Sequence, residues 1–159
     1  MKKIKLYLDS SVIGALDDNE MPDRMQETHR LWNDIIKRKY DVVFSEVLFD
    51  ELVECCQTKK DILTNFIKQI KFKYMETNEM ILNITKEIIK MGILTENSYR
   101  DCLHIATALY SDCDIIISWN MKHLVKPKTI KGVRTLTDIL HYKKIDIVTP
   151  KSMNIKETK

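Results

Sequence analysis

Short runs of β-branched and apolar residues alternate along this chain with longer segments of helical periodicity. The first run, residues 4–8, alternates its side chains with the period of a strand. A later run, residues 113–118, is almost continuously apolar, which is typical of a central parallel strand that is covered on both faces. Between such runs, apolar residues recur every three or four positions, as on the buried stripe of a helix. This alternation predicts a three-layer α/β/α fold with a mostly parallel central sheet.

The same pattern sets the limits of the expected elements. Strands are expected over residues 4–8, 41–45, 73–76, 113–118 and 145–148. Helices are expected over residues 10–17, 24–39, 45–56, 60–71, 78–91, 98–110 and 137–142, with Ser45 as an N-cap and Gly92 at the end of a helix. Residues 1–150 are therefore expected to form a single domain, and residues 151–159 are expected to be a frayed C-terminal tail.

Composition narrows the class of protein. Hydrophobic residues make up 44% of the 159 residues, so a packed globular core is expected and disorder is not. The four cysteines form no Cys-x-x-Cys pair, which argues against a zinc site or a disulfide framework and favours a reduced, cytoplasmic protein. The apolar run after the basic residues 1–3 is too short for a signal peptide. No apolar stretch is long enough to cross a bilayer, so no membrane association is expected.

Charge is unevenly distributed along the chain. Residues 122–159 hold ten Lys and Arg against three Asp and Glu, a net charge of +7, whereas residues 1–121 hold sixteen against twenty, a net charge of −4. This division suits a protein that binds a cation in one place and phosphates in another. An exposed tail that is kept in solution by its lysines would give the same pattern, and the sequence leaves both interpretations open.

Oxygen-bearing side chains follow the ends of several expected strands. Because ligands of open parallel sheets bind beyond the carboxyl ends of the strands, these side chains are expected to share one crevice. The residues concerned are Asp9, Ser10 and Ser11 after the first strand, Ser45, Glu46, Asp50 and Glu51 after the second, Ser118 and Asn120 after residues 113–118, and Asp101 in the first turn of a helix. Carboxylate, amide and hydroxyl oxygens are the ligands that Mg²⁺ and Mn²⁺ prefer.

Each of these residues also has a purely structural interpretation. Asp9 could cap the following helix, and Asp101 could complete a capping box with Ser98. Glu51 could be solvated surface, and His104 could be a core histidine. The joint placement of four oxygen-bearing segments nevertheless favours a site.

Three stretches resemble the motifs of PIN-domain ribonucleases. The first is LYLDSSVIG, the second is SEVLFDELVE, and the third and most specific is NSYRDCLHIATALYSDCDIIISWNMKHL. The resemblance covers roughly residues 4–124, and the family includes the VapC-type toxins of prokaryotic toxin–antitoxin pairs. It implies a PIN-like fold, an RNA substrate, a cognate antitoxin and a homodimer.

The resemblance also implies roles for particular residues. Asp9, Glu51 and Asp101 match the metal-binding acids, with Glu46 as the alternative to Glu51. Asn120 stands where many members have a fourth acid, so the site would hold one negative charge fewer. Independently of the resemblance, the proposed chemistry makes Ser10, Ser11 and Ser118 candidates for positioning water or substrate. Lys122, Lys126 and Lys128 follow the site-bearing strand, and their charge makes them candidates for contacts to RNA phosphates.

The expected function is therefore Mg²⁺- or Mn²⁺-dependent hydrolysis of RNA phosphodiester bonds. The alternative is a PIN-like module that binds RNA or a protein without cleavage, which the amide at Asn120 favours. A phosphotransfer domain of the receiver or haloacid dehalogenase type fits less well, because Ser10 and Ser11 follow Asp9 in place of an Asp-x-Asp pattern.

Overall fold

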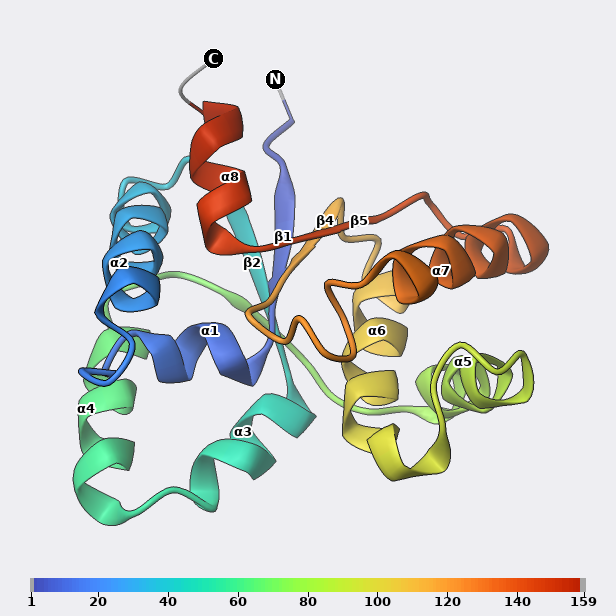
Figure 1. Ribbon diagram of the computed structural model, residues 1–159, viewed down its shortest axis with the longest axis horizontal. Helices are drawn as coiled ribbons and strands as arrows, with labels where there is room; N and C mark the ends of the chain where they lie inside the picture. The colour runs from blue at the N-terminus through green and yellow to red at the C-terminus, as the bar shows by residue number, and fades with distance from the viewer. Residues whose placement is uncertain (1, 158–159) are drawn as a thin grey trace.

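The computed structural model of the protein describes residues 2–157 (Figure 1). Within this range the chain alternates between strands and helices, as the sequence pattern predicts. The elements are β1 (Lys5–Leu8), α1 (Ser10–Ala15), α2 (Pro22–Ile36), β2 (Asp41–Ser45), α3 (Glu46–Val53), α4 (Gln57–Ile67), β3 (Lys73–Met75), α5 (Glu79–Lys90), a 3₁₀ turn (Glu96–Ser98), α6 (Tyr99–Tyr110), β4 (Ile115–Ile117), α7 (Pro127–Leu140), β5 (Asp146–Val148) and α8 (Pro150–Glu157).

The strands of the described chain form one sheet in the order β3-β2-β1-β4-β5, and every pairing in it is parallel. The first strand lies at the centre, where Leu6 pairs with Val42 on one side and with Ile115 on the other. Since all strands run the same way, their carboxyl ends meet at one edge of the sheet. In Figure 1 this is the lower edge, where α1, α3 and the start of α6 come together.

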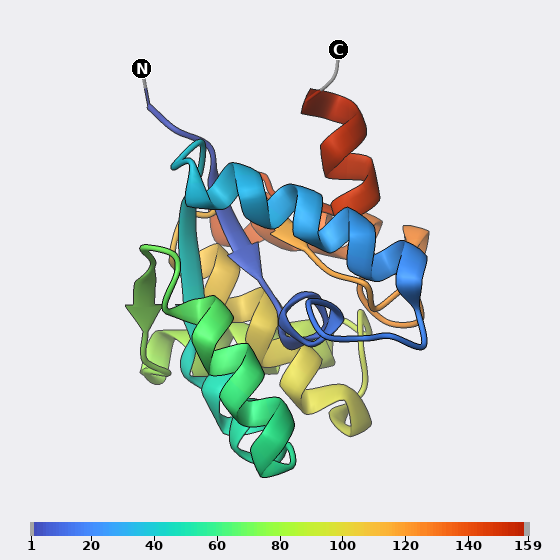
Figure 2. The same ribbon diagram turned by 90° about the vertical axis from the view of Figure 1, so that its left-hand side faces the viewer.

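Two apolar clusters fill the space between the sheet and its helices. Alternation along β1 sends Leu6 and Leu8 to one face and Tyr7 to the other, and all three side chains are buried. The first face is covered by α1, α2, α3, α4 and α8, and Figure 2 shows α2 crossing in front of the strands. The second face is covered by α5, α6 and α7. This arrangement gives the three expected layers.

The helix boundaries expected at Ser45 and Gly92 are present, whereas Ser98 precedes α6 without a capping hydrogen bond from its side chain. The Ser45 hydroxyl accepts a hydrogen bond from the Leu48 amide at 3.1 Å and begins α3. Gly92 follows α5 with a φ of +73°, a conformation that favours glycine. No helix among the described residues is both long and apolar enough to cross a membrane.

The C-terminal quarter differs from the prediction. A helix was expected only over residues 137–142, but α7 already begins at Pro127, because Val133 and Leu136 pack into the second cluster. The predicted frayed tail is wrong for residues 151–157, which form α8 on the surface of α2, and residues 158–159 lie outside the described part. The cause is tertiary packing: Met153 is 1% exposed, and the Asn154 amide donates to the Glu27 carbonyl oxygen at 2.9 Å.

Candidate active site

Asp9 lies directly after β1 and is 3% exposed. Its Oδ1 accepts hydrogen bonds from the Ser11 amide at 3.1 Å, the Ser11 hydroxyl at 2.5 Å and the Val12 amide at 3.3 Å. Its Oδ2 accepts from the Ser118 hydroxyl at 2.5 Å. Asp9 is therefore the N-cap of α1, as one interpretation of the sequence expects, and it is also tied to the end of β4.

Glu51, on α3, is joined to the sheet through a chain of buried polar groups. Its Oε1 lies 2.6 Å from Nε2 of His104, whose Nδ1 contacts the hydroxyl of Tyr7. That hydroxyl lies 2.8 Å from the hydroxyl of Ser45. Since an ionised carboxylate only accepts hydrogen bonds, Nε2 carries the proton in the contact with Glu51. The chain thus connects α3 with α6, β1 and β2.

Asp101 lies in the first turn of α6 and faces Asn120, which lies in the loop after β4. The Asn120 amide nitrogen is 3.4 Å from Asp101 Oδ1, and the Asn120 amide oxygen accepts from the His123 backbone N–H at 2.9 Å. We expected this amide to offer its oxygen to a metal ion. The hydrogen bonds instead turn its nitrogen toward the acids, where it can donate to a carboxylate.

The pKa values of the three acids reflect one shared environment. Burial raises the pKa of Asp9, although His104 and the hydroxyls of Ser11 and Ser118 oppose this effect. Burial also raises the pKa of Asp101, His104 and His123 lower it, and the charges of Asp9 and Glu51 raise it further.

Glu51 behaves differently because of its direct contact with His104. Burial acts to raise the pKa of Glu51, but hydrogen bonding to His104 and its electrostatic influence outweigh burial, and the Ser10 hydroxyl adds to the lowering. His104 thus lowers the pKa of all three carboxyls, and of the three it contacts Glu51 directly.

Glu51 and its alternative Glu46 have different surroundings, and the choice between them as the second acid stays a prediction. Glu51 affects the pKa of Asp101, whereas Glu46 affects that of Tyr74 on the neighbouring strand. In the arrangement of residues 2–157, no group of three or more His, Cys, Asp or Glu side chains is placed to hold a metal ion.

The three candidate serines act on two of the acids. Ser11 and Ser118 hydrogen-bond to Asp9, and the Ser10 hydroxyl lowers the pKa of Glu51. Their expected role in positioning water or substrate remains a prediction, and the role that the contacts describe is the positioning of carboxylates.

The three candidate lysines share one pocket, and none of the three acids lines it. Lys122, Lys126 and Lys128 are exposed and line one pocket of about 180 Å³ together with Ser98 and His123. Ser98 precedes the helix that carries Asp101, and His123 is bonded to Asn120. The pocket therefore adjoins Asn120 and the start of α6, and contact of its lysines with RNA phosphates stays a prediction.

The sequence did not indicate the contributions of Tyr7 and His104. The local pattern predicts that Tyr7 is a strand residue, and nothing in it indicates a role for the Tyr7 hydroxyl. The position of His104, one helical turn after Asp101, was the available signal, because residues three apart lie on the same helix face.

No family model and no curated protein matches this chain. Eleven chains of solved structures do match it. One of them is from the crystal structure of VapBC2 from Rickettsia felis bound to a DNA fragment from their promoter. That match covers 92% of this chain and 98% of the other, with a TM-score of 0.59 and 11% sequence identity. At this identity the likeness concerns the fold, and it confirms the predicted PIN-like three-layer α/β/α architecture.

Proposed function

We propose that this chain is a Mg²⁺- or Mn²⁺-dependent endoribonuclease of the PIN type that hydrolyses RNA phosphodiester bonds as the toxin of a toxin–antitoxin pair. The observation that carries the proposal is the placement of three acids beyond the carboxyl ends of the strands: Asp9 directly follows β1, Glu51 on α3 contacts the buried His104, and Asp101 in the first turn of α6 faces Asn120. Acids from three separate elements meet there although they are far apart in sequence.

The donor set fits a hard divalent cation. Carboxylate oxygens are its preferred ligands, and the pKa of Asp101, raised by burial and by Asp9 and Glu51, indicates negative charge that a cation would balance. Mg²⁺ is often held by one or two carboxylates together with waters and substrate phosphates, so Asp9 and Asp101 would hold it without a third acid, and Glu51 would stay with His104. When bound, such an ion would activate a water for in-line attack and stabilise charge on the leaving oxygen.

The other residues of the site would hold these acids in place. Ser11 and Ser118 fix the carboxylate of Asp9, and Asn120 directs a donor at Asp101. His104 holds Glu51 through a buried ring that is itself held by Tyr7. Preorganisation of this kind reduces the reorganisation needed when substrate binds.

The proposal includes the partners of the site. RNA phosphates next to the scissile bond would contact Lys122, Lys126 and Lys128. The likeness to VapBC2 supports a cognate antitoxin as a protein partner. The PIN resemblance favours a homodimer, for which sedimentation would give twice the mass of one chain.

Substitution of single acids tests the activity. We expect Asp101→Asn and Asp9→Asn to reduce Mn²⁺-dependent cleavage of single-stranded RNA to background while the circular dichroism spectrum is unchanged. Asp138→Asn is the matched control, because Asp138 is exposed on α7. Glu51→Gln should abolish cleavage and Glu46→Gln should not. Full activity in both Asp9→Asn and Asp101→Asn would overturn the proposal.

A second candidate function is binding of RNA or protein without cleavage. It is favoured by the amide at Asn120, which adds no negative charge and turns its oxygen toward His123. Calorimetric titration with Mn²⁺ separates the two functions. Binding that is lost in Asp101→Asn supports the nuclease, and no binding at millimolar Mn²⁺ supports the binding module.

A further inference from the structure

A basic hollow lies at the edge of the sheet opposite the acid cluster. Because the strands are parallel, the amino ends of β1, β2 and β3 gather there. The hollow has a volume of about 330 Å³. Its charged lining residues are Lys3, Lys5, Arg38, Lys71, Lys73 and Asp41. They come from the entrance to β1, the connection from α2 to β2, and the segment that leads into β3.

The positive charge of this hollow is not balanced within the described chain. Five cationic side chains face one carboxylate, and none of the five belongs to an ion pair among residues 2–157. The Lys5 ammonium donates one hydrogen bond, at 3.2 Å, to the Ser111 carbonyl oxygen. Like charges held around a confined space repel one another, and an anion in that space would relieve the repulsion.

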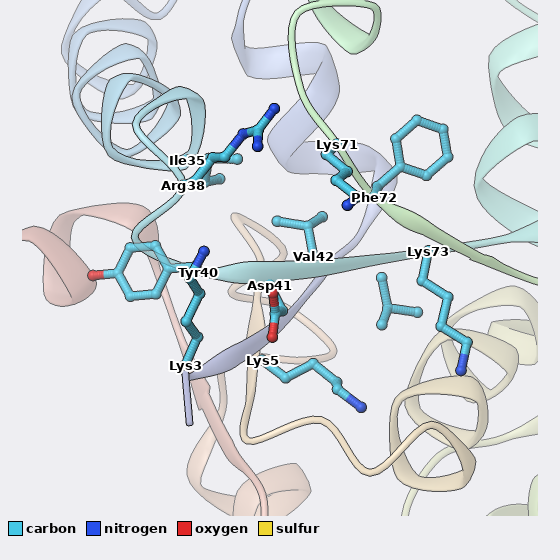
Figure 3. Close-up of a pocket in the computed structure, with 11 residues that line it drawn as sticks. Lys3, Lys5, Ile35, Arg38, Tyr40, Asp41, Val42, Lys71, Phe72 and Lys73 are labelled. Atoms are coloured by element: carbon cyan, nitrogen blue, oxygen red, sulfur yellow. The ribbon is translucent and has the colours of Figure 1, made fainter. Parts of the chain in front are cut away.

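The arrangement favours a ligand with several negative charges. In Figure 3, Arg38 and Lys71 lie on one side of the β2 ribbon, and Lys3 and Lys5 lie on the other. The cations thus lie on both sides of β2 at this edge of the sheet. A single phosphate would meet only some of them, whereas a chain of phosphates could meet several cations at once.

Apolar side chains provide the rest of the lining. Ile35 and Val42 are buried, and Phe72 is half-buried and packs on Phe44 with ring centroids 4.7 Å apart. A hollow of a few hundred Å³ that combines an apolar lining with a few charged groups has the size and character of a small-molecule site. We propose that it binds a nucleotide with two or more phosphates, the phosphates at the cationic side chains and the base against the apolar lining.

This ligand chemistry has two sources, a free nucleotide or consecutive nucleotides of an RNA strand. Calorimetry in EDTA would compare ATP, inorganic triphosphate and a short 2′-O-methyl RNA. We expect ATP to bind more tightly than triphosphate, since the base adds apolar contact. Lys71→Glu/Lys73→Glu should weaken ATP binding by at least about tenfold, because two attractive charges become repulsive. Lys90→Glu/Lys144→Glu makes the same change at exposed lysines outside the hollow and should have little effect.

The outcomes separate this site from the acid cluster. Unchanged ATP affinity in Asp101→Asn supports a separate site, whether or not that variant cleaves RNA. Binding of the RNA without ATP, with the same dependence on Lys71 and Lys73, assigns the phosphates to an RNA strand. The proposal is wrong if neither ATP nor RNA binds, if triphosphate binds as tightly as ATP, or if both double variants weaken binding equally.

Discussion

The carboxylate of Asp9 combines a structural role with a candidate catalytic one. It caps α1 through the Ser11 and Val12 amides, and it is held to the end of β4 by Ser118. The cap fixes the orientation of the side chain, and the charge of Asp9 raises the pKa of Asp101. Capping and metal binding, which the sequence presents as alternatives, are thus compatible at this residue.

The hydroxyl of Tyr7 holds the buried histidine of the site. It contacts His104 Nδ1 and lies 2.8 Å from the Ser45 hydroxyl, with all three residues buried. Tyr7→Phe keeps the ring and removes this link, which leaves a buried ring nitrogen without its partner. We expect a loss of about 1–3 kcal/mol in the free energy of unfolding, measured by urea denaturation.

A surface tyrosine provides the control for this substitution. Tyr99 is 42% exposed, so Tyr99→Phe should change the free energy of unfolding by less than about 0.5 kcal/mol. Equal values for the two variants would show that the chain from Ser45 to Glu51 adds no stability.

The sequence predicts the role of a single residue only where the local pattern around it indicates that role. The sequence shows Asp9 after a strand, Glu51 on the helix that follows a strand, and Asp101 in the first turn of a helix. The parallel topology then directs these positions to one edge of the sheet. The orientation of Asn120 depends on the His123 amide, and the role of Ser118 depends on a residue 109 positions away. Such contacts are set by the completed fold.

Helices α7 and α8 show how tertiary packing overrides a weak local pattern. Gly132 and several threonines lower the helix propensity of α7, yet its buried stripe of Val133 and Leu136 stabilises it against the second cluster. Pro150 reads as the end of a strand, but proline also suits the first turn of a helix, and α8 starts there.

Met153 anchors α8 to the rest of the fold. Its side chain is 1% exposed and belongs to the cluster formed by α1, α2 and α4. Met153→Ala should lower the free energy of unfolding by about 2–4 kcal/mol through lost burial and a residual cavity. The control is Lys151→Ala on the exposed side of the helix, for which urea denaturation should show almost no change. A small effect at Met153 would mean that α8 contributes little to stability.

Asp114 connects three elements and gives the fold a pH dependence. Its Oδ2 accepts from the Lys5 amide at the start of β1 at 2.8 Å, and its Oδ1 pairs with Lys143 before β5. Burial acts to raise the pKa of Asp114, but these two partners outweigh burial and lower it below the ordinary value of 3.8. A carboxyl whose pKa is lower in the folded state adds stability above its unfolded pKa, and this stability is lost as the pH falls through the folded value.

A double-mutant cycle of Asp114→Asn and Lys143→Gln isolates this contribution. We expect a coupling energy at pH 7 that decreases as the pH is lowered below about 4, measured by urea denaturation across the range. The coupling should be modest, because the Asp114 side chain is 28% exposed. A coupling energy that is the same at pH 3 and pH 7 would contradict the assignment.

In the whole molecule, charged residues group at the two edges of the sheet and not by their position along the sequence. Residues 1–121 carry a net charge of −4, yet all five cations of the basic hollow belong to them. The parallel sheet sends the amino ends of β1, β2 and β3 to one edge and the acids to the other. The net charge summed over sequence segments does not reveal this separation, because residues from several segments form each edge of the sheet.

The lysines of the pocket that adjoins Asn120 should determine how RNA binding depends on salt. Binding to a single strand releases counterions, and the slope of log K against log salt is about −0.7 per phosphate contacted. Replacement of Lys122, Lys126 and Lys128 by Gln should therefore reduce the magnitude of this slope by about 2. Fluorescence anisotropy with single-stranded RNA in EDTA would measure this slope without cleavage.

The matched control replaces the exposed residues Lys86, Lys90 and Lys144, which lie outside this pocket. If both triple variants change the slope equally, RNA binding depends on the overall charge of the protein and not on contacts to Lys122, Lys126 and Lys128.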